Sequence, residues 1–168
     1  MWDKVALSDF EDDVTESLRL IEPSIERLTF VGDSKDGRIP RVKVRGSSHP
    51  VPLRSMGDGM SRLLGIALSL VNARDGFLLI DEVENGIHYS VQADIWRLIL
   101  RNAGRLGVQV FATTHSWDCI LAFQQACEEF PEGNGIATRL EFRRGRIAAS
   151  QFDQNDLKIA AREHIEIR

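Results

Sequence analysis

The pattern of apolar and polar residues predicts helices that alternate with short strands along most of the chain. In the first helix, at about residues 9–21, the apolar side chains share one face, and Ser8 and Glu11 form a capping-box pattern. Pro23 follows and ends this helix. The later predicted elements are strands 25–31 and 41–45, helix 60–73, strand 77–80, helix 90–105, strand 108–113, helix 116–130, a hairpin of strands 138–142 and 146–150, and helix 155–165.

Polar residues mark the expected starts and turns of these elements. Ser90, Ser116 and Asn155 stand at predicted helix N-caps, because a short polar side chain can accept a hydrogen bond from the first helical turn. Residues 32–38 and 46–52 are rich in glycine, proline and polar residues. They predict a turn and a loop.

The order of the elements predicts the fold class. Helix 60–73 is apolar nearly all round, and strands 77–80 and 108–113 are short and apolar, as buried strands of a parallel sheet are. We therefore expect an α/β fold, with a parallel central sheet flanked by helices and an additional β-hairpin. A single domain over 1–168 is expected, made of an N-terminal part (1–54), a core (55–130) and a C-terminal hairpin and helix (131–168).

Composition and charge narrow the function only mildly. The chain has 168 residues and a formal net charge of −4, which fits one core and gives no general attraction to nucleic acid. No apolar run reaches bilayer length and no signal-peptide pattern is present, so we expect a cytoplasmic location and no membrane contact. Cys119 and Cys127 lie roughly 12 Å apart along one predicted helix, too far for a disulfide.

Residues 77–82 read F-L-L-I-D-E, an apolar strand that runs directly into two carboxylates. Burying a strand that stops on Asp81 and Glu82 makes physical sense where the carboxylates meet a cation, a water to be activated, or both. This layout is that of a Walker B strand in a nucleotide hydrolase.

Three further segments stand where such a site needs them. Residues 55–62, S-M-G-D-G-M-S-R, put a glycine-rich turn before a helix whose free N–H groups favour phosphate, although such a turn also occurs simply as a tight turn. Residues 82–90, E-V-E-N-G-I-H-Y-S, lead from the strand into the next helix and also read as an ordinary loop. Residues 112–116, A-T-T-H-S, put His115 at a carboxyl strand end, where parallel sheets bind ligands.

In order and spacing, these four segments resemble the C-terminal half of an ABC-type ATPase head, in the SMC/RecF/OLD-like branch of AAA-labelled ATPases. The resemblance is close over residues 50–125 and looser on either side. It implies a P-loop NTPase-like fold, and ATP binding and hydrolysis with Mg²⁺ by two heads that dimerise around the nucleotide.

The resemblance also implies residue roles. Asp81 would hold Mg²⁺, and Glu82 would act as the general base on the attacking water. His115 would contact the γ-phosphate as the switch histidine. The signature, Met56–Met60, would reach ATP on the opposite head. The D-loop, Glu84–His88, would contact that head and its nucleotide. Their nucleotide-contacting residues would be Gly57, Asp58, Gly59, Glu84, Asn85 and Gly86.

The chain departs from the family pattern in two ways. Gly57 stands where relatives usually carry a serine, so a hydroxyl contact to the γ-phosphate is lost. In addition, no lysine follows a glycine, so these residues contain no Walker A loop, G-x-x-x-x-G-K-S/T, whose lysine neutralises phosphate charge. We expect weak ATP binding and no ATPase activity from the chain alone, a segment or partner that bears the Walker A, and an apolar surface left open.

Other interpretations remain open at this stage. A non-catalytic, ATP-gated interaction module or degenerate head fits the same motifs. A metal-dependent hydrolase is less favoured, because its ligands lack the spacing of known sites. Nucleic acid is a candidate partner through two basic clusters. The candidate metal ligands are Asp81, Glu82, Glu84, His88 and His115, and the basic clusters are Arg41, Lys43 and Arg45, and Arg143, Arg144 and Arg146.

Overall fold

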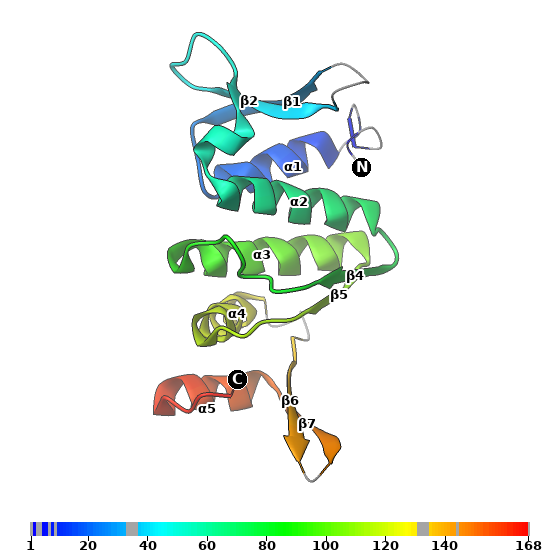
Figure 1. Ribbon diagram of the computed structural model, residues 1–168, viewed down its shortest axis with the longest axis vertical. Helices are drawn as coiled ribbons and strands as arrows, with labels where there is room; N and C mark the ends of the chain where they lie inside the picture. Colours follow the sequence, from blue (N-terminus) through cyan, green and yellow to red (C-terminus); the bar gives the residue numbers. More distant parts are fainter. Residues whose placement is uncertain are drawn as a thin grey trace.

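The computed structural model describes residues 2, 5, 6, 8, 10–32, 37–130, 135–143 and 145–167. The predicted helix start at residue 9, most of the turn at 32–38 and residue 144 lie outside them. The elements stack along one long axis, from the β1–β2 sheet at one end to α5 and the β6–β7 hairpin at the other (Figure 1). In chain order they are α1 (Phe10–Arg19), β1 (Ile25–Val31), β2 (Ile39–Val44), β3 (Val51–Pro52), the 3-10 helix η2 (Leu53–Met56), α2 (Asp58–Asn72), β4 (Phe77–Ile80), α3 (Tyr89–Leu106), β5 (Gln109–Ala112), α4 (Trp117–Glu129), β6 (Ala137–Arg143), β7 (Arg146–Phe152) and α5 (Gln154–Glu163).

The N-terminal sheet is antiparallel, with strand order β1–β2–β3. Leu28 of β1 lies opposite Val42 of β2, and both side chains are buried in the main core. The sequence predicted only a loop over 46–52, and this was wrong for its end, because Val51 pairs with Val42 to start β3. Pro52 is tolerated there, since an edge strand has backbone positions that need not donate to a neighbour.

Helix α2 occupies the middle of the main core. It begins at Asp58 with Gly57 as its N-cap, two residues earlier than predicted. The predicted burial is confirmed, because seven apolar side chains spread around the helix are buried. They are Met60, Leu63, Leu64, Ile66, Ala67, Leu68 and Leu70.

Strands β4 and β5 are parallel neighbours, with Phe77 opposite Gln109 and Ile80 opposite Ala112. Helix α3 connects them, as a crossover between parallel strands requires. This confirms the α/β class and brings the carboxyl ends of the two predicted strands together at one edge of the sheet.

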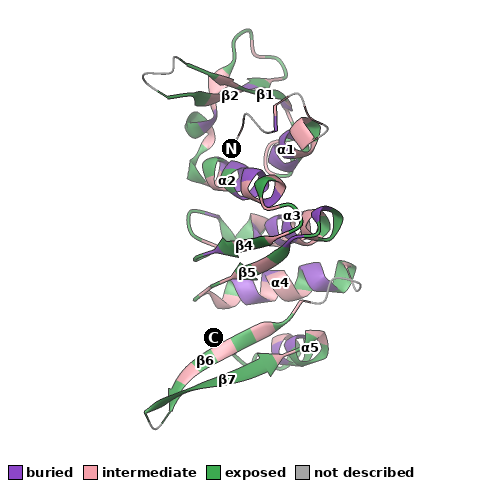
Figure 2. Cartoon of the chain, turned by 90° about the vertical axis from the view of Figure 1, so that its right-hand side faces the viewer, coloured by how far each residue is buried: buried purple, intermediate pink, exposed green. Residues whose placement is uncertain are grey.

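The prediction that these strands are buried on both faces was wrong for the described residues. Leu78, Ile80 and Val110 pack toward the main core, but Leu79 is 78% exposed and Phe111 is 52% exposed. Exposed positions alternate with covered ones along both strands (Figure 2). Successive side chains of a strand point to opposite faces, so the helices cover one face and the outer face stays open.

Two predicted helix caps were also wrong, each by two residues. His88, and not Ser90, is the N-cap of α3, and its side chain accepts from the Ser90 N–H. Asp153, and not Asn155, caps α5 in a capping box with Asp156. In both cases an acceptor slightly earlier in the chain reaches the free N–H groups of the first turn.

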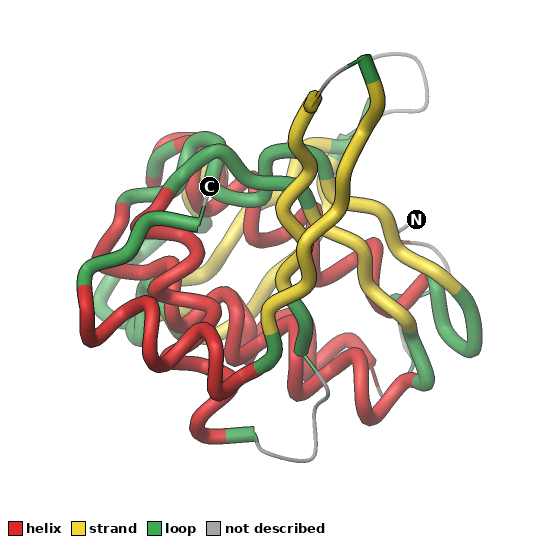
Figure 3. Tube along the Cα trace, turned by 90° about the horizontal axis from the view of Figure 1, so that it is seen from below, coloured by secondary structure: helices red, strands yellow, loops and turns green. Residues whose placement is uncertain are grey.

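The C-terminal region packs around a second, smaller cluster of buried residues, Ile120, Leu157, Ala160 and Ile167. The predicted hairpin is confirmed and is longer than expected, and it projects past the helices (Figure 3). Cys119 and Cys127 are both buried and free. Within the described ranges, no helix has the length and apolarity to cross a membrane.

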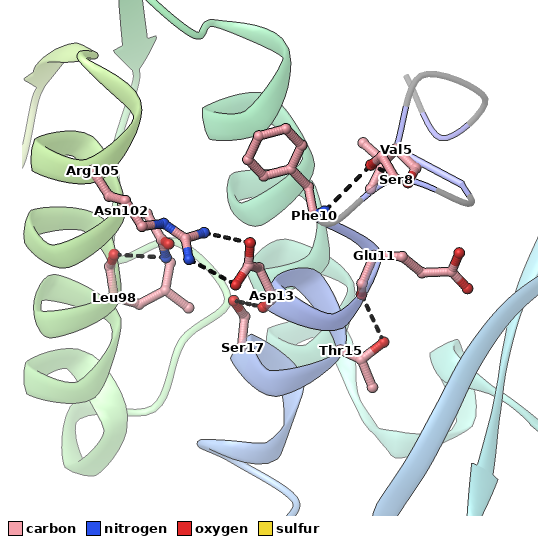
Figure 4. Close-up of polar contacts among 10 residues, drawn as sticks. All are labelled: Val5, Ser8, Phe10, Glu11, Asp13, Thr15, Ser17, Leu98, Asn102 and Arg105. Carbon is pink, nitrogen blue, oxygen red and sulfur yellow. Dashed lines mark hydrogen bonds and ion pairs between the residues drawn. The ribbon is translucent and has the colours of Figure 1, made fainter.

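An ion pair ties α1 to α3 across 92 residues of chain. The Arg105 guanidinium donates to both carboxylate oxygens of Asp13, with Nη1 at 2.9 Å from Oδ1 (Figure 4). This hydrogen bond raises the pKa of Arg105. The Arg105 side chain is 49% exposed, so solvent screens the pair.

A double-mutant cycle over Asp13→Asn and Arg105→Gln is expected to give a coupling free energy of about 0.5–1 kcal/mol, because the pair is bidentate but screened. Urea unfolding of the parent, both single variants and the double variant measures it. The coupling should shrink in high salt. A coupling near zero at low salt would show that the contact adds nothing to stability.

Candidate functional site

The candidate site lies at the carboxyl edge of β4 and β5, where a loop leaves each strand. Two backbone hydrogen bonds extend the ladder past the strands: the Thr113 N–H donates to the Ile80 carbonyl (2.9 Å), and the Val83 N–H donates to the Thr113 carbonyl (3.0 Å). The two loops therefore begin side by side, and Asp81 and Glu82 lie next to Thr113.

The Thr113 hydroxyl contacts both predicted site residues, Asp81 through its carboxylate and Glu82 through its backbone. It donates to Asp81 Oδ1 at 2.6 Å and accepts from the Glu82 backbone N–H at 2.9 Å. The first distance is in the range of a hydrogen bond to a charged carboxylate. Asp81 and Glu82 are both exposed and open to a ligand.

Glu82 has a left-handed backbone conformation, with φ of 45°. For a residue with a side chain this costs on the order of 1–3 kcal/mol, and such strain concentrates at functional sites. Surrounding contacts hold it: the Glu82 carbonyl accepts from the Asn85 N–H (2.9 Å) and from Arg62 Nη2 (3.1 Å). Asn85 Nδ2 also lies 3.4 Å from Glu82 Oε2.

Arg62 connects the signature helix to this loop. It lies on α2, and its Nη2 donates to the carbonyl oxygens of both Asp81 (2.7 Å) and Glu82 (3.1 Å). Its Nε is buried and has no hydrogen-bond partner among the described residues. One guanidinium thus fixes the backbone that carries both carboxylates.

Glu84 and His115 meet through the backbone of His115, whose N–H donates to Glu84 Oε1 at 3.0 Å. The other oxygen, Glu84 Oε2, is buried and unpartnered within the described part of the chain. The His115 side chain is exposed. The structure thus brings His115 to the same edge as Asp81 and Glu82, as the parallel strand order predicts.

The glycine-rich segment lies against the D-loop. Gly57 has φ of 105°, a conformation that favours glycine, and Asp58 and Gly59 form the first turn of α2 rather than a loop before it. A Cβ on Gly59 would come within 3.2 Å of the Gly86 carbonyl oxygen. This close approach joins the two segments that the sequence placed on one site.

The candidate ligands of a metal-dependent hydrolase are Asp81, Glu82, Glu84, His88 and His115. Among the described residues, no group of three His, Cys, Asp or Glu side chains converges to hold a metal ion. His88 Nδ1 is engaged at the start of α3, 2.9 Å from the Ser90 hydroxyl.

The buried cysteines do not provide a nucleophile to this edge of the sheet. Burial raises the pKa of the Cys127 thiol to about 11. Burial is also the main cause that raises the pKa of Cys119. Both thiols therefore stay protonated near neutral pH, and a protonated thiol is a poor nucleophile.

The two basic clusters are partly neutralised. In the first cluster, Lys43 pairs with Glu26 at 3.2 Å. In the second, Arg143 pairs with Glu141 of the β6–β7 hairpin, and Glu141 also pairs with Arg139. Contact with nucleic acid remains a prediction.

Sequence reasoning missed two residues of this site, Thr113 and Arg62. Thr113 could have been found from strand register, because the pairing of Ile80 with Ala112 makes Asp81 and Thr113 the next pair. Arg62 gives no such signal, since its contacts depend on how tertiary packing places α2 beside the loop.

Comparison with curated proteins finds an ATP/GTP phosphatase and an uncharacterized protein among the relatives of this chain. The chain is 30% identical over 131 residues to an ATP/GTP phosphatase of Helicobacter pylori, a match that covers 73% of this chain and 33% of the relative. It is 35% identical over 85 residues to the uncharacterized protein MJECL11 of Methanocaldococcus jannaschii, covering 50% of this chain and 75% of that protein. The chain thus spans about a third of the length of the Helicobacter relative.

Solved structures show the fold. One, from work on "ATP-driven dimerization and DNA stimulated activation of SMC ATPases", has a TM-score of 0.62 at 11% identity, over 95% of this chain and 92% of the other. The Smc head domain of Pyrococcus furiosus, bound to the C-terminal domain of ScpA, has a TM-score of 0.58 at 13% identity, over 94% of this chain and 38% of the other. At these identities the likeness shows the fold alone, which is that of an SMC-type P-loop NTPase head.

A family model described as "AAA domain, putative AbiEii toxin, Type IV TA system" matches residues 6–121, more than half of the chain. The fold, the order of the motifs at the β4–β5 edge and this match agree, and the chain belongs to this AAA domain family.

Proposed function

We propose that the chain supplies the signature, Walker B, D-loop and switch-histidine portion of an ATPase head, which hydrolyses ATP together with a Walker A-bearing segment. The observation that carries this proposal is the fixed placement of Asp81 and Glu82 at the end of β4, bound to Thr113 of the neighbouring strand end. Phosphoryl transfer needs positioned charge more than covalent help, and this edge offers it.

Each side chain has a role in this proposal. Glu82 accepts a proton from the attacking water, and its strained backbone directs the carboxylate. His115 contacts the γ-phosphate from the adjoining loop. Gly57 leaves open space for phosphate oxygens to approach the N-terminus of α2, where free N–H groups and the helix dipole favour an anion.

The residues present fit Mg²⁺. Mg²⁺ is commonly bound by one or two carboxylates plus substrate phosphates and water, and Asp81 offers an exposed carboxylate oriented by one hydrogen bond. Asp81 would hold the ion, which supplies charge neutralisation at the phosphates when bound.

Two observations support a partner segment that bears the Walker A loop. The 168 residues contain no G-K pair, so the lysine that neutralises phosphate charge has to come from elsewhere. The outer face of β4–β5 also exposes Phe77, Leu79 and Phe111, whereas parallel sheets are normally covered on both faces. A Walker A-bearing segment that covers this face would supply the lysine and would bury the exposed apolar side chains.

A mixing experiment tests this function. The chain is co-expressed with a segment that bears G-x-x-x-x-G-K-S/T, and Mg²⁺-dependent ATP turnover and ATP-dependent dimerisation are measured. We expect turnover from the assembled head and none from the chain alone. Robust turnover by the chain alone would contradict the need for a partner. ATP-dependent dimerisation without turnover would favour the ATP-gated interaction module.

A further inference from the structure

The Thr113 hydroxyl makes contacts that none of the roles assigned to the sequence motifs explains. It stands two residues before His115, and its single proton is directed to Asp81 Oδ1 (2.6 Å), while one of its lone pairs accepts the Glu82 N–H (2.9 Å). A hydroxyl has one donor and two acceptor sites, so these two bonds fix both its rotation and the direction of its proton. One side chain thus contacts both the carboxylate assigned to Mg²⁺ and the backbone of the assigned general base.

The contact comes from strand register rather than from chance proximity. Backbone bonds from Thr113 N–H to the Ile80 carbonyl and from Val83 N–H to the Thr113 carbonyl hold the loops on both sides of the hydroxyl. Threonine is branched at Cβ and therefore restricted at χ1, which keeps the hydroxyl in place. The pairing of the two strand ends thus places the hydroxyl beside the Asp81 carboxylate and the Glu82 N–H.

Glu82 depends on this contact. Its left-handed backbone, φ 45°, is held on the carbonyl side by Arg62 and Asn85, and on the N–H side by the Thr113 hydroxyl. Removing the hydroxyl frees the N–H side and leaves Asp81 Oδ1 without this donor. Both carboxylates would then lose their fixed relation to each other.

We propose that Thr113 is a positioning residue for ATP hydrolysis, whose hydroxyl sets the Asp81 carboxylate and the Glu82 backbone relative to one another. The inference rests on the proposed function. Groups that orient a metal-binding carboxylate commonly change metal affinity or activity by about 10–100-fold when removed. Thr113 also joins the loop of His115 to the loop of Glu82 through these hydrogen bonds.

Two substitutions separate the hydroxyl from the shape of the side chain. Thr113→Val keeps the branched shape and removes the hydroxyl, whereas Thr113→Ser keeps the hydroxyl. In the assembled head, Thr113→Val is expected to lower kcat about 10–100-fold and to raise the Mg²⁺ concentration needed for half-maximal rate, with little change in KM for ATP. Thr113→Ser should recover most of the rate. Thr29→Val, at an exposed position of strand β1, is the matched control.

A second measurement needs no catalysis. In the 168-residue chain, Thr113→Val should accelerate amide hydrogen exchange at Glu82, which donates to the hydroxyl, and should leave Val83 protected, since it donates to a backbone carbonyl. Unchanged exchange at Glu82, or a Thr113→Val head with parental kcat, would overturn the proposal. A parent head without ATPase activity counts against the proposed function instead, and the exchange result still decides whether Thr113 holds Glu82.

Discussion

Replacing Glu82 with glutamine is expected to lower kcat for ATP hydrolysis by the assembled head about 10²–10⁴-fold, the contribution of a positioned general base. Glutamine has the shape of glutamate, and its amide oxygen can still accept from Asn85 Nδ2, which lies 3.4 Å from Glu82 Oε2. What is lost is the ability to accept a proton from water. Steady-state turnover at saturating ATP and Mg²⁺ measures the effect.

The same variant should still bind ATP, because the assigned phosphate contacts lie at the N-terminus of α2, at His115 and on the partner. ATP-dependent dimers should therefore last longer, since the nucleotide that holds them is not consumed. Glu163→Gln, at the exposed end of α5, is the control and should keep the parental rate. A Glu82→Gln head that turns over ATP at the parental rate would remove Glu82 from the reaction.

The arrangement of the site was predictable because it depends on strand order and direction. Two short apolar strands separated by one helix predict a parallel pair, and a parallel pair puts Asp81 and His115 at the same edge. The pairing of Ile80 with Ala112 confirms this. Local pattern sufficed here because Asp81 and His115 lie within three residues of a strand end.

The bonds that hold the site were not predictable in the same way. Arg62 reaches the loop carbonyls only because tertiary packing brings α2 next to this loop, which residue spacing along α2 does not encode. The cap of α3 was misplaced for a similar reason: His88 and Ser90 are both capable acceptors, and loop geometry selects His88. Tertiary packing decides between acceptors that local pattern treats as equal.

The burial of β4 and β5 was predicted from their apolar residues. An apolar sequence shows that a strand can be buried, but it does not show which element covers each face. Phe77, Leu79 and Phe111 are apolar, yet in the described chain their face of the sheet is open. Phe77 and Phe111 touch each other, with ring centroids 6.3 Å apart, but such a pair leaves most of their surface in water. Contiguous exposed apolar surface on a sheet is typical of an interaction site.

Leu79→Asp is therefore expected to weaken association with the Walker A-bearing segment at least about 100-fold, because a carboxylate would be buried without a partner at the centre of the contact. The unfolding midpoint of the chain itself should hardly change, since Leu79 is 78% exposed. Calorimetric titration and urea unfolding measure the two effects. Ile39→Asp, at an exposed apolar position on β2, is the matched control and should bind normally. Equal binding by Leu79→Asp and the parent would show that this face is not where the partner docks.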